Sequence, residues 1–143
     1  MSVDAAQMWT LNQRLLSVVL AACSAELAEL GLDTKEFFVL AEVADSPYPA
    51  ELAETLMIPK ASVTVYVRNL VGKGFMRREI DEQDLRRHRL VLTAEGEAAR
   101  DRALAALAAE FDRRLARIEP RDRLELRRIL LALLDPEPVP DRS

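Results

Sequence analysis

The hydrophobic period of this chain changes at Phe75, and that change constrains the fold more than any other feature. Residues 58–74 have helical spacing, with apolar side chains three and four positions apart. Residues 75–80 and 88–93 instead alternate with a period of two, and the polar segment 81–87 joins them. Two short strands joined in this way predict a β-hairpin that directly follows a helix.

Three further helices are predicted before that one. Asp4 is a suitable N-cap for a long first helix that ends at Gly31. Asp33 and Glu36 have the spacing of a capping box that opens a second helix, and Pro49 suits the first turn of a third. The residues predicted to face inward from the second, third and fourth helices are Phe37, Leu40, Ala41, Ala44, Leu52, Ala53, Leu56, Val63, Val67, Leu70 and Val71.

Two more helices are predicted after the hairpin. Thr93 caps a helix of about 24 residues, Pro120 opens a last one that ends at Leu134, and the polar, Pro-rich tail 136–143 is predicted to be mobile. The first helix has apolar residues on two sides, and both sides need burial. These two stripes are Met8, Leu11, Leu15, Val18, Ala22 and Leu16, Val19, Cys23, Leu27, Leu30. The pattern therefore favours a second subunit.

Composition excludes several classes of function. No apolar run approaches the ~18 residues of a membrane span, no secretory signal is visible, and one cysteine excludes an internal disulfide, so we expect a cytoplasmic protein without a membrane partner. One histidine, one cysteine and four glycines leave no nucleophile–base pair, metal site or phosphate-binding loop. We therefore expect neither an enzyme nor a cofactor.

Positive charge is concentrated in the middle of the chain. Residues 60–89 hold eight basic and four acidic residues, a balance of +4, whereas residues 1–59 and 90–143 have balances of −7 and −1. A solvated charged face explains many such blocks. A block that also contains a helix pair and a hairpin is typical of nucleic-acid binding instead.

The segment from Gly74 through the hairpin resembles the MarR family of bacterial transcription regulators. The family pattern is a glycine, a strand with arginine, Asp-x-x-Asp-x-Arg, a second strand and Leu-Thr-x-x-Gly. The matching residues are Gly74, Arg78, Asp81, Asp84, Arg86, Leu92, Thr93 and Gly96. The chain departs from the family at Gln83, Leu85, Pro59 and Val65, which bears on DNA sequence preference.

The resemblance implies a mostly α fold with a small β-hairpin wing, a winged helix-turn-helix with long N- and C-terminal dimerisation helices. Residues 1–143 then form a single domain, in which 1–31 and 93–135 dimerise and 32–92 bind DNA. It also implies that Arg86 enters a minor groove and that Asp84 holds its guanidinium by a two-pronged hydrogen bond. The alternative is an exposed hairpin whose Asp and Arg merely pair.

The outer face of residues 62–69 in the fourth predicted helix suits the major groove. Arg68 is a candidate for reading guanine, Asn69 adenine, and the methyl groups of Thr64 and Val65 thymine, while Lys60, Ser62 and Thr64 are alternative phosphate contacts. A solvated helix face is the competing interpretation. The complete predicted DNA-binding set is Lys60, Ala61, Ser62, Thr64, Val65, Arg68, Asn69, Arg78, Asp84, Arg86 and Arg87.

The resemblance also implies a small aromatic or phenolic effector bound between the dimerisation helices and the DNA-binding lobe. The candidate lining residues are Leu15, Val19, Phe37, Phe38 and Leu40, with a plain packed core as the alternative. Cys23 is read as a buried structural cysteine, with redox sensing as the alternative. His88 is read as a phosphate contact or a solvated strand residue, and Met8 and Trp9 as interface or core groups.

The predicted function is a homodimeric repressor that binds a pseudo-palindromic operator in double-stranded DNA and is released by a small ligand. The alternatives are a winged-helix module that binds a protein partner and a redox-responsive regulator that uses Cys23. The central basic block argues against the protein-binding module, and a steep salt dependence of DNA affinity distinguishes the two.

Overall fold

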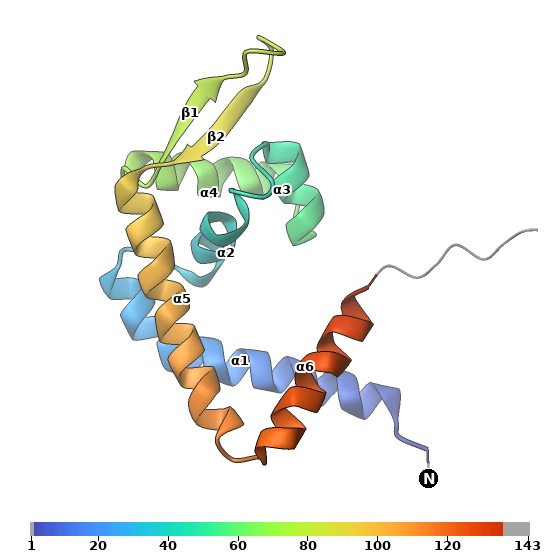
Figure 1. Ribbon diagram of the computed structural model, residues 1–143. Coiled ribbons are helices and arrows are strands. Elements are labelled where there is room, and N and C mark those ends of the chain that lie inside the picture. The colour runs from blue at the N-terminus through green and yellow to red at the C-terminus, as the bar shows by residue number, and fades with distance from the viewer. Residues whose placement is uncertain (1, 136–143) are drawn as a thin grey trace, which may run out of the picture. The chain divides into compact units, whose positions relative to one another are not determined.

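The computed structural model describes residues 2–135 and confirms a mostly helical chain with one antiparallel hairpin (Figure 1). The elements are α1 (Ala5–Glu29), α2 (Thr34–Glu42), α3 (Pro49–Leu56), α4 (Lys60–Gly72), β1 (Met76–Ile80), β2 (His88–Leu92), α5 (Ala94–Leu115) and α6 (Pro120–Leu134). The predicted mobile tail 136–143 lies outside the described residues. The chain divides into two compact units, residues 1–110 and 111–143, with the boundary inside α5.

Local capping accounts for where the helices begin. The Asp4 carboxylate accepts the amide of Ala6 at 3.0 Å. Asp33 and Glu36 form the predicted capping box: the Glu36 amide donates to Asp33 Oδ1 at 2.7 Å, and the Asp33 amide donates to Glu36 Oε1 at 3.1 Å. Pro49 opens α3 as predicted, whereas Pro59 is the N-cap of α4 rather than part of its first turn.

The core of the first unit is built around α2, which packs against α1, α3 and α4. Its innermost side chains include Leu27, Val39, Leu40, Leu52, Val63, Val67, Leu70, Met76 and Leu90. The predicted inner face of α2 is partly wrong, because Ala44 is exposed whereas Val39 and Val43 are fully buried. A helix with neighbours on several sides buries more than one apolar stripe, and the prediction assumed a single stripe.

The hairpin of β1 and β2, called the wing here (residues 76–92), extends beyond the helices of the first unit (Figure 1). Its register pairs Met76 with Leu92 at the base and Ile80 with His88 at the far end. The middle of the wing is held by the amide of Leu90, which donates to the carbonyl of Pro47 at 2.8 Å. Burial of Met76 at the base and of Leu90 at the middle strand pair packs this part of the wing against the core.

The start of α5 lies close to the start of the wing. The Thr93 hydroxyl accepts the amide of Gly96 at 3.0 Å, which confirms the predicted cap, and donates to the carbonyl of Gly74 at 2.6 Å. A Cβ atom added at Gly96 would lie 1.8 Å from the carbonyl oxygen of Phe75. Only glycine permits this approach of helix to backbone.

The two apolar stripes of α1 have different surroundings. Val19, Cys23 and Leu27 of one stripe are buried in the first unit. Met8 and Leu11 of the other stripe are about half exposed, and Trp9 beside them is about two-thirds exposed. Within the first unit, the buried part of α1 is therefore limited to one stripe, from Val19 to Leu27.

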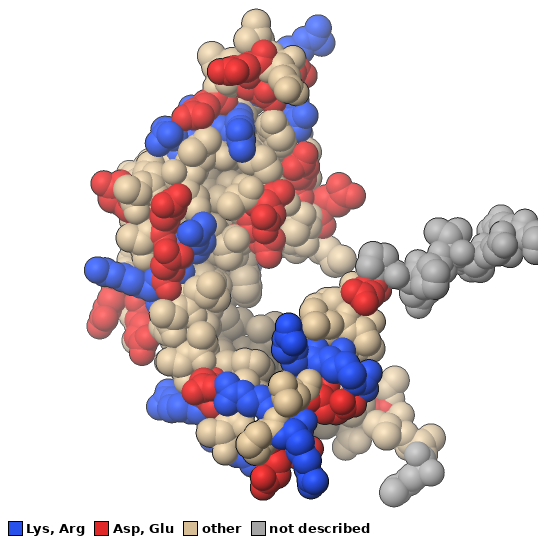
Figure 2. Space-filling view, viewed as in Figure 1, with Lys and Arg blue, Asp and Glu red and all other residues tan. Residues whose placement is uncertain are grey.

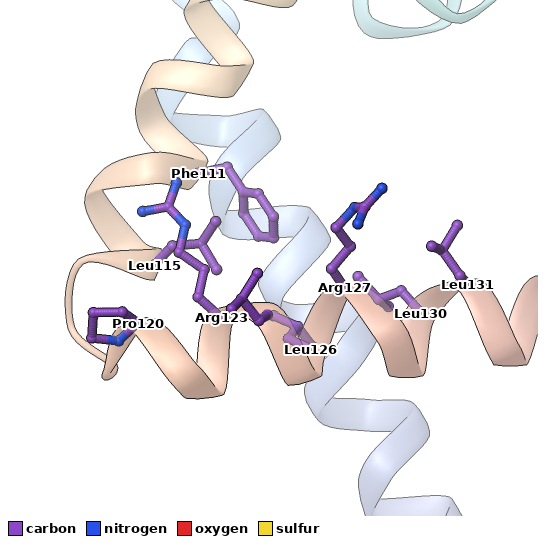
Figure 3. Close-up of a pocket in the computed structure, with 9 residues that line it drawn as sticks. Phe111, Leu115, Pro120, Arg123, Leu126, Arg127, Leu130 and Leu131 are labelled. Carbon is purple, nitrogen blue, oxygen red and sulfur yellow. The ribbon is translucent and has the colours of Figure 1, made fainter.

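In the second unit, α6 has no buried residue although its sequence is rich in leucine. Leu124, Leu133 and Leu134 are each more than two-thirds exposed. A groove of about 620 Å³ lies between the end of α5 and α6, with Phe111 and Leu115 on one side and Leu130 on the other (Figure 3). This unit thus presents apolar surface that its own residues do not cover.

Among the residues described, no single helix is both long and apolar enough to cross a membrane. By length and composition, α1 and α2 pass that test only as a pair, and the pair is bent by 84°.

Candidate DNA-binding site

The outer face of α4 presents the residues predicted to read DNA. Val63, Val67 and Leu70 anchor the opposite face in the core, which fixes the rotation of the helix about its axis. Six of the seven predicted residues are exposed, and the seventh, Ser62, is half-buried; the exposed ones are Lys60, Ala61, Thr64, Val65, Arg68 and Asn69. The Thr64 hydroxyl donates to the carbonyl of Lys60 at 3.0 Å. This face combines small, amide and guanidinium groups, which suits base edges in a major groove.

On the wing, Arg78, Asp84 and Arg86 are exposed. The expected two-pronged pair between Asp84 and the Arg86 guanidinium is not formed. Asp84 Oδ1 instead accepts the backbone amide of Arg86 at 3.0 Å, as aspartate does in a local turn. The carboxylate therefore shapes the tip of the wing and leaves the guanidinium of Arg86 unpaired within residues 2–135.

A basic hollow of about 360 Å³ lies beside the wing. Its lining comes from α3, α4 and both sides of the hairpin, and consists of Tyr48, Pro49, Ala50, Lys60, Arg78, Arg86, Arg87 and His88. Within the described part of the chain, Lys60, Arg78 and Arg86 form no ion pair. Unpaired cations that converge from three elements suit a polyanion such as a nucleic-acid backbone.

Arg87, which the sequence also assigned to DNA, has contacts within the protein. Its guanidinium carbon lies 3.5 Å from the centre of the Tyr48 ring, a cation–π geometry. It also lies 3.6 Å from a carboxylate oxygen of Glu51. The hydroxyl of Tyr48 donates to Asp81 Oδ2 at 2.6 Å. These four residues, Tyr48, Glu51, Asp81 and Arg87, are called the wing latch below.

The hydrogen bond of the wing latch shifts the titration of both partners. The bond to the Asp81 carboxylate, aided by partial burial, raises the pKa of Tyr48 above its ordinary value of 10.0. The same bond, followed by the one from the Gln83 amide, lowers the pKa of Asp81 below its ordinary value of 3.8. The neutral phenol and the charged carboxylate are thus the favoured forms.

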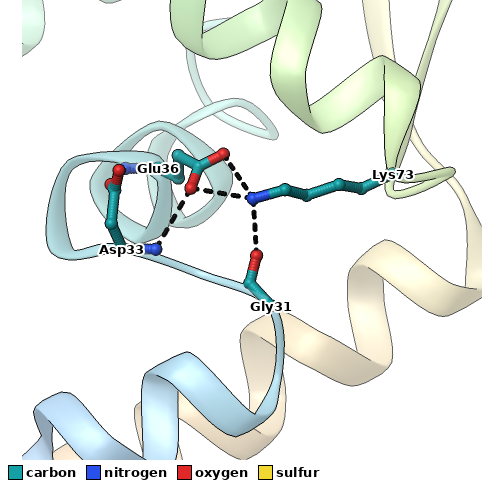
Figure 4. A network of polar contacts seen from close by, with 4 residues as sticks. All are labelled: Gly31, Asp33, Glu36 and Lys73. Atoms are coloured by element: carbon teal, nitrogen blue, oxygen red, sulfur yellow. Dashed lines mark hydrogen bonds and ion pairs between the residues drawn. The ribbon is translucent and has the colours of Figure 1, made fainter.

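A second polar network fastens the end of α4. The Lys73 ammonium donates to both carboxylate oxygens of Glu36, at 2.9 and 2.8 Å, and to the carbonyl of Gly31 at 2.6 Å (Figure 4). Glu36 is buried and also closes the capping box with Asp33. A buried carboxylate needs such a partner, because an unpaired charge there is costly. The network ties the C-terminal end of α4 to the junction of α1 and α2.

These pairings reduce the free positive charge that the central block suggested. Lys73 pairs with Glu36, Arg77 with Glu79 and Arg87 with Glu51. On the hairpin at the top of Figure 2, basic and acidic side chains are interspersed and do not form one continuous basic patch.

The residues predicted to line an effector pocket are distributed between core and surface. Phe37, Leu40 and Val19 are buried, Phe38 is half-buried with its ring 5.8 Å from that of Phe37, and Leu15 is 36% exposed. None of the five lines the groove beside α6 or the basic hollow beside the wing. The effector pocket remains a prediction.

Cys23 is buried, as expected for a structural cysteine, and its thiol donates to the carbonyl of Ala106 at 3.5 Å. His88 is exposed at the end of β2 and lines the basic hollow. Within residues 2–135, no three histidine, cysteine or carboxylate side chains are grouped to hold a metal ion.

Two contributors to this site were not predicted from the sequence. The sequence predictions gave neither Tyr48 nor Glu51 a role in this site. Tyr48 and its partner Asp81 are 33 positions apart, and no local pattern connects them. The one available signal was the position of Tyr48 between Pro47 and Pro49, which restricts the backbone there but does not indicate which residue Tyr48 contacts.

Comparison with known proteins decides the family. The MarR family profile matches residues 34–88, from α2 to the start of β2. The HTH-type transcriptional repressor Rv2887 of Mycobacterium tuberculosis is 32% identical over 129 residues, which cover 89% of this chain and 93% of that protein. This chain belongs to the MarR family. The resemblance seen in the sequence is thereby confirmed.

Two solved structures of Rv2887 extend the similarity to three dimensions. The complex with DNA has a TM-score of 0.74 at 28% identity and covers 94% of this chain and all of that one. The complex with p-aminosalicylic acid has a TM-score of 0.72 at 30% identity and covers 88% of this chain and 97% of that one.

Proposed function

We propose that this MarR-family protein is a sequence-specific, double-stranded DNA-binding repressor that acts in the cytoplasm and is not an enzyme. The observation that carries the proposal is the juxtaposition of an exposed, mixed-polarity face on α4 with Lys60, Arg78 and Arg86, three cations of the basic hollow that form no ion pair within residues 2–135. The similar repressor from M. tuberculosis, solved with DNA, supports the same assignment.

In this proposal the parts of the site have different tasks. Arg68, Asn69 and the neighbouring small residues of α4 read base edges in the major groove. Lys60 and Arg78 contact phosphates, which position the protein without specifying sequence. Arg86 projects from the wing toward a minor groove, where narrow A/T-rich DNA concentrates negative potential.

The uncovered apolar surfaces support a homodimer. One stripe of α1 is exposed in the first unit and most leucines of α6 are exposed in the second, and burial of such surface drives association. A twofold dimer presents two copies of α4 to two half-sites, so the operator is expected to be pseudo-palindromic. We assign residues 1–31 and 93–135 to dimerisation and residues 32–92 to DNA binding.

We further propose that a small aromatic or phenolic ligand releases the DNA, as the complex of the relative with p-aminosalicylic acid suggests. Leu15, Val19, Phe37, Phe38 and Leu40 remain the candidate lining. Such a ligand acts only through a difference in affinity for the DNA-bound and released arrangements.

The test is fluorescence anisotropy on an operator selected from random DNA and on an unrelated duplex, at low and moderate salt. Arg86→Ala is expected to lose affinity about tenfold, within the ~1–3 kcal/mol typical of a groove-contacting arginine. Arg77→Ala is the matched control, because Arg77 carries the same charge on the same hairpin but pairs with Glu79.

Selective, salt-sensitive binding that weakens in Arg86→Ala and not in Arg77→Ala supports the DNA-binding repressor. Equal weak binding to both duplexes, unchanged by Arg86→Ala, overturns it. The protein-binding winged helix then becomes the better interpretation.

A further inference from the structure

The wing latch is a set of contacts that the proposed DNA-reading groups do not include. The Tyr48 hydroxyl donates to Asp81 at 2.6 Å, and the guanidinium of Arg87 lies 3.5 Å from the centre of the Tyr48 ring. Arg87 also lies 3.6 Å from Glu51, in the first turn of α3. Two residues of the hairpin are thus held by two residues of the segment that opens α3.

The latch acts at one particular level of the hairpin. Asp81 and Arg87 directly follow and precede the last strand pair, Ile80 with His88, and the Asp81 amide donates to the Arg87 carbonyl at 3.0 Å. Beyond this level, the hydrogen bonds of the tip 82–86 within the described chain are local ones to residues 81, 84 and 87. The wing latch therefore contacts the wing at the level where strand pairing ends, directly before the tip 82–86.

A two-stranded hairpin has little stability of its own in water. The wing is also fixed by the bond from the Leu90 amide to the Pro47 carbonyl, but that contact lies at the middle strand pair, Arg78 with Leu90, and not at the tip. The direction of the tip consequently depends on side-chain support near Asp81 and Arg87. Arg86 directly precedes Arg87 in the chain. Contacts that hold Arg87 in place therefore also restrict the backbone position of Arg86.

We propose that Tyr48 is a positioning residue for DNA recognition, which fixes the tip of the wing through Asp81 and Arg87 and thereby places Arg86. Arg87 then acts through Tyr48 and Glu51 rather than by neutralising a phosphate. This inference rests on the proposed DNA-binding function and deepens it. It assigns a role to a residue that lies on neither the reading helix nor the wing.

The central experiment compares Tyr48→Phe with the natural protein on two duplexes. One carries the full selected operator, and the other is trimmed at both ends until the contribution of the wing to the affinity is lost. Tyr48→Phe keeps the ring under Arg87 but removes the hydroxyl. It is expected to weaken binding to the full operator about five- to tenfold, the size of one typical net hydrogen-bond contribution, and to leave the trimmed duplex unaffected.

Tyr66→Phe is the matched control, because it removes the other of the two tyrosine hydroxyls in the chain. It is expected to leave the difference between the two duplexes intact. If Tyr48→Phe weakens binding equally on both duplexes, Tyr48 has a general structural role and the positioning role is overturned. The positioning role is also overturned if Tyr48→Phe changes binding on neither duplex.

A measurement without DNA separates failure of this inference from failure of the proposed function. Hydrogen exchange at the Asp81 amide is expected to become about fivefold to tenfold faster in Tyr48→Phe, while amides in the middle of α4 keep their rates. If the natural protein binds no DNA but the Asp81 amide responds, the repressor assignment fails and the latch is real. An unchanged exchange rate at Asp81 overturns the latch whatever the DNA result.

The salt dependence of affinity tests the role of Arg87. A phosphate-contacting arginine changed to alanine reduces the slope of log affinity against log salt by about one unit. Arg87→Ala is expected to lower affinity for the full operator without this change in slope, and Arg87→Lys is expected to restore little, because lysine cannot reproduce the planar stacking. A slope reduced by one unit assigns Arg87 to a phosphate and overturns this part of the proposal.

Discussion

Helices α4 and α6 are of similar length and are both amphipathic, but they are buried very differently. In α4, Val63, Val67 and Leu70 are almost completely buried. In α6, no residue is buried, although Leu130 and Leu131 stand where a core-facing stripe is expected. Helix α4 is thus covered by its own unit, whereas α6 is not covered by the residues of its own unit.

The polar contacts differ in the same way. The end of α4 is tied to α2 by Lys73 and the buried Glu36, residues 37 positions apart. Two ion pairs of the second unit, Arg123 with Asp112 and Arg128 with Glu125, are exposed, and such pairs contribute little to stability. The difference teaches that α4 is anchored within its own unit by burial and by a buried ion pair, whereas α6 is not, which agrees with the proposed role of α6 in association.

The largest expected effects come from matched leucine truncations in the two helices. Leu70→Ala is expected to reduce the free energy of unfolding by about 2–5 kcal/mol, because it opens a cavity in a closed core. This loss is independent of protein concentration, since Leu70 is buried by its own chain. Leu130→Ala, at a side chain 40% exposed, is expected to act on association instead. Thermal unfolding over a hundredfold range of protein concentration measures both.

In the natural protein the melting temperature is expected to rise with concentration, as it does for a folded dimer. In Leu130→Ala this rise is expected to shrink, with little change at the lowest concentration. A loss in Leu130→Ala that is the same at every concentration would mean that α6 is buried by its own chain. The contrast between α4 and α6 would then be wrong.

A smaller effect is expected at the junction of the wing with α5. Gly96→Ala places a Cβ atom 1.8 Å from the carbonyl oxygen of Phe75, and that carbonyl already accepts the Thr93 amide at 3.1 Å. The backbone must move and weaken this bond, so a loss of about 1–3 kcal/mol is expected. Chemical denaturation measures it directly.

Gly72→Ala is the control for this change. Gly72 ends α4 with open space around it, so alanine there is expected to be neutral or to stabilise by up to about 1 kcal/mol. Equal effects of the two substitutions would show that the close approach at Gly96 does not constrain the lobe.

Much of the fold was predictable because its signals are local. The Asp33–Glu36 capping box, the Thr93 cap and the change of period at Phe75 each lie within a few residues, and each is present in the structure as predicted. The family pattern from Gly74 to Gly96 joined these parts into a winged helix-turn-helix. Its last glycine has a physical reason, the approach to Phe75.

The remaining features depend on contacts between distant residues. Ala44 was placed inside because one apolar stripe was assumed, whereas the several neighbours of α2 bury Val39 and Val43 instead. Asp84 was expected to hold the guanidinium of Arg86 but holds its amide, because a turn of this length brings the amide closer. Sequence patterns indicate which groups are charged, but not which of them pair.

The smallest expected effect tests whether the exposed wing latch behaves as a real contact, in contrast to the buried fastening at Glu36. The raised pKa of Tyr48 means that its contribution to stability is present below pH 10.0 and is lost as pH rises through the folded-state value above 10.0. The lowered pKa of Asp81 means that its contribution is present above pH 3.8 and is lost as pH falls through the folded-state value below 3.8. The latch is therefore intact across the neutral range.

Near-ultraviolet absorbance of tyrosinate measures the upper limit in a Tyr66→Phe background, where Tyr48 is the only tyrosine. Its titration is expected above pH 10.0, and addition of Asp81→Ala is expected to move it back toward 10.0, because the hydrogen bond to Asp81 is the largest cause of the shift. Circular dichroism over the same range shows whether the helices persist. A titration of Tyr48 that does not respond to the change at residue 81 would mean that the contact does not last in solution. The wing would then be held by the buried Met76 and by the bond from Leu90 to Pro47, without support near its tip.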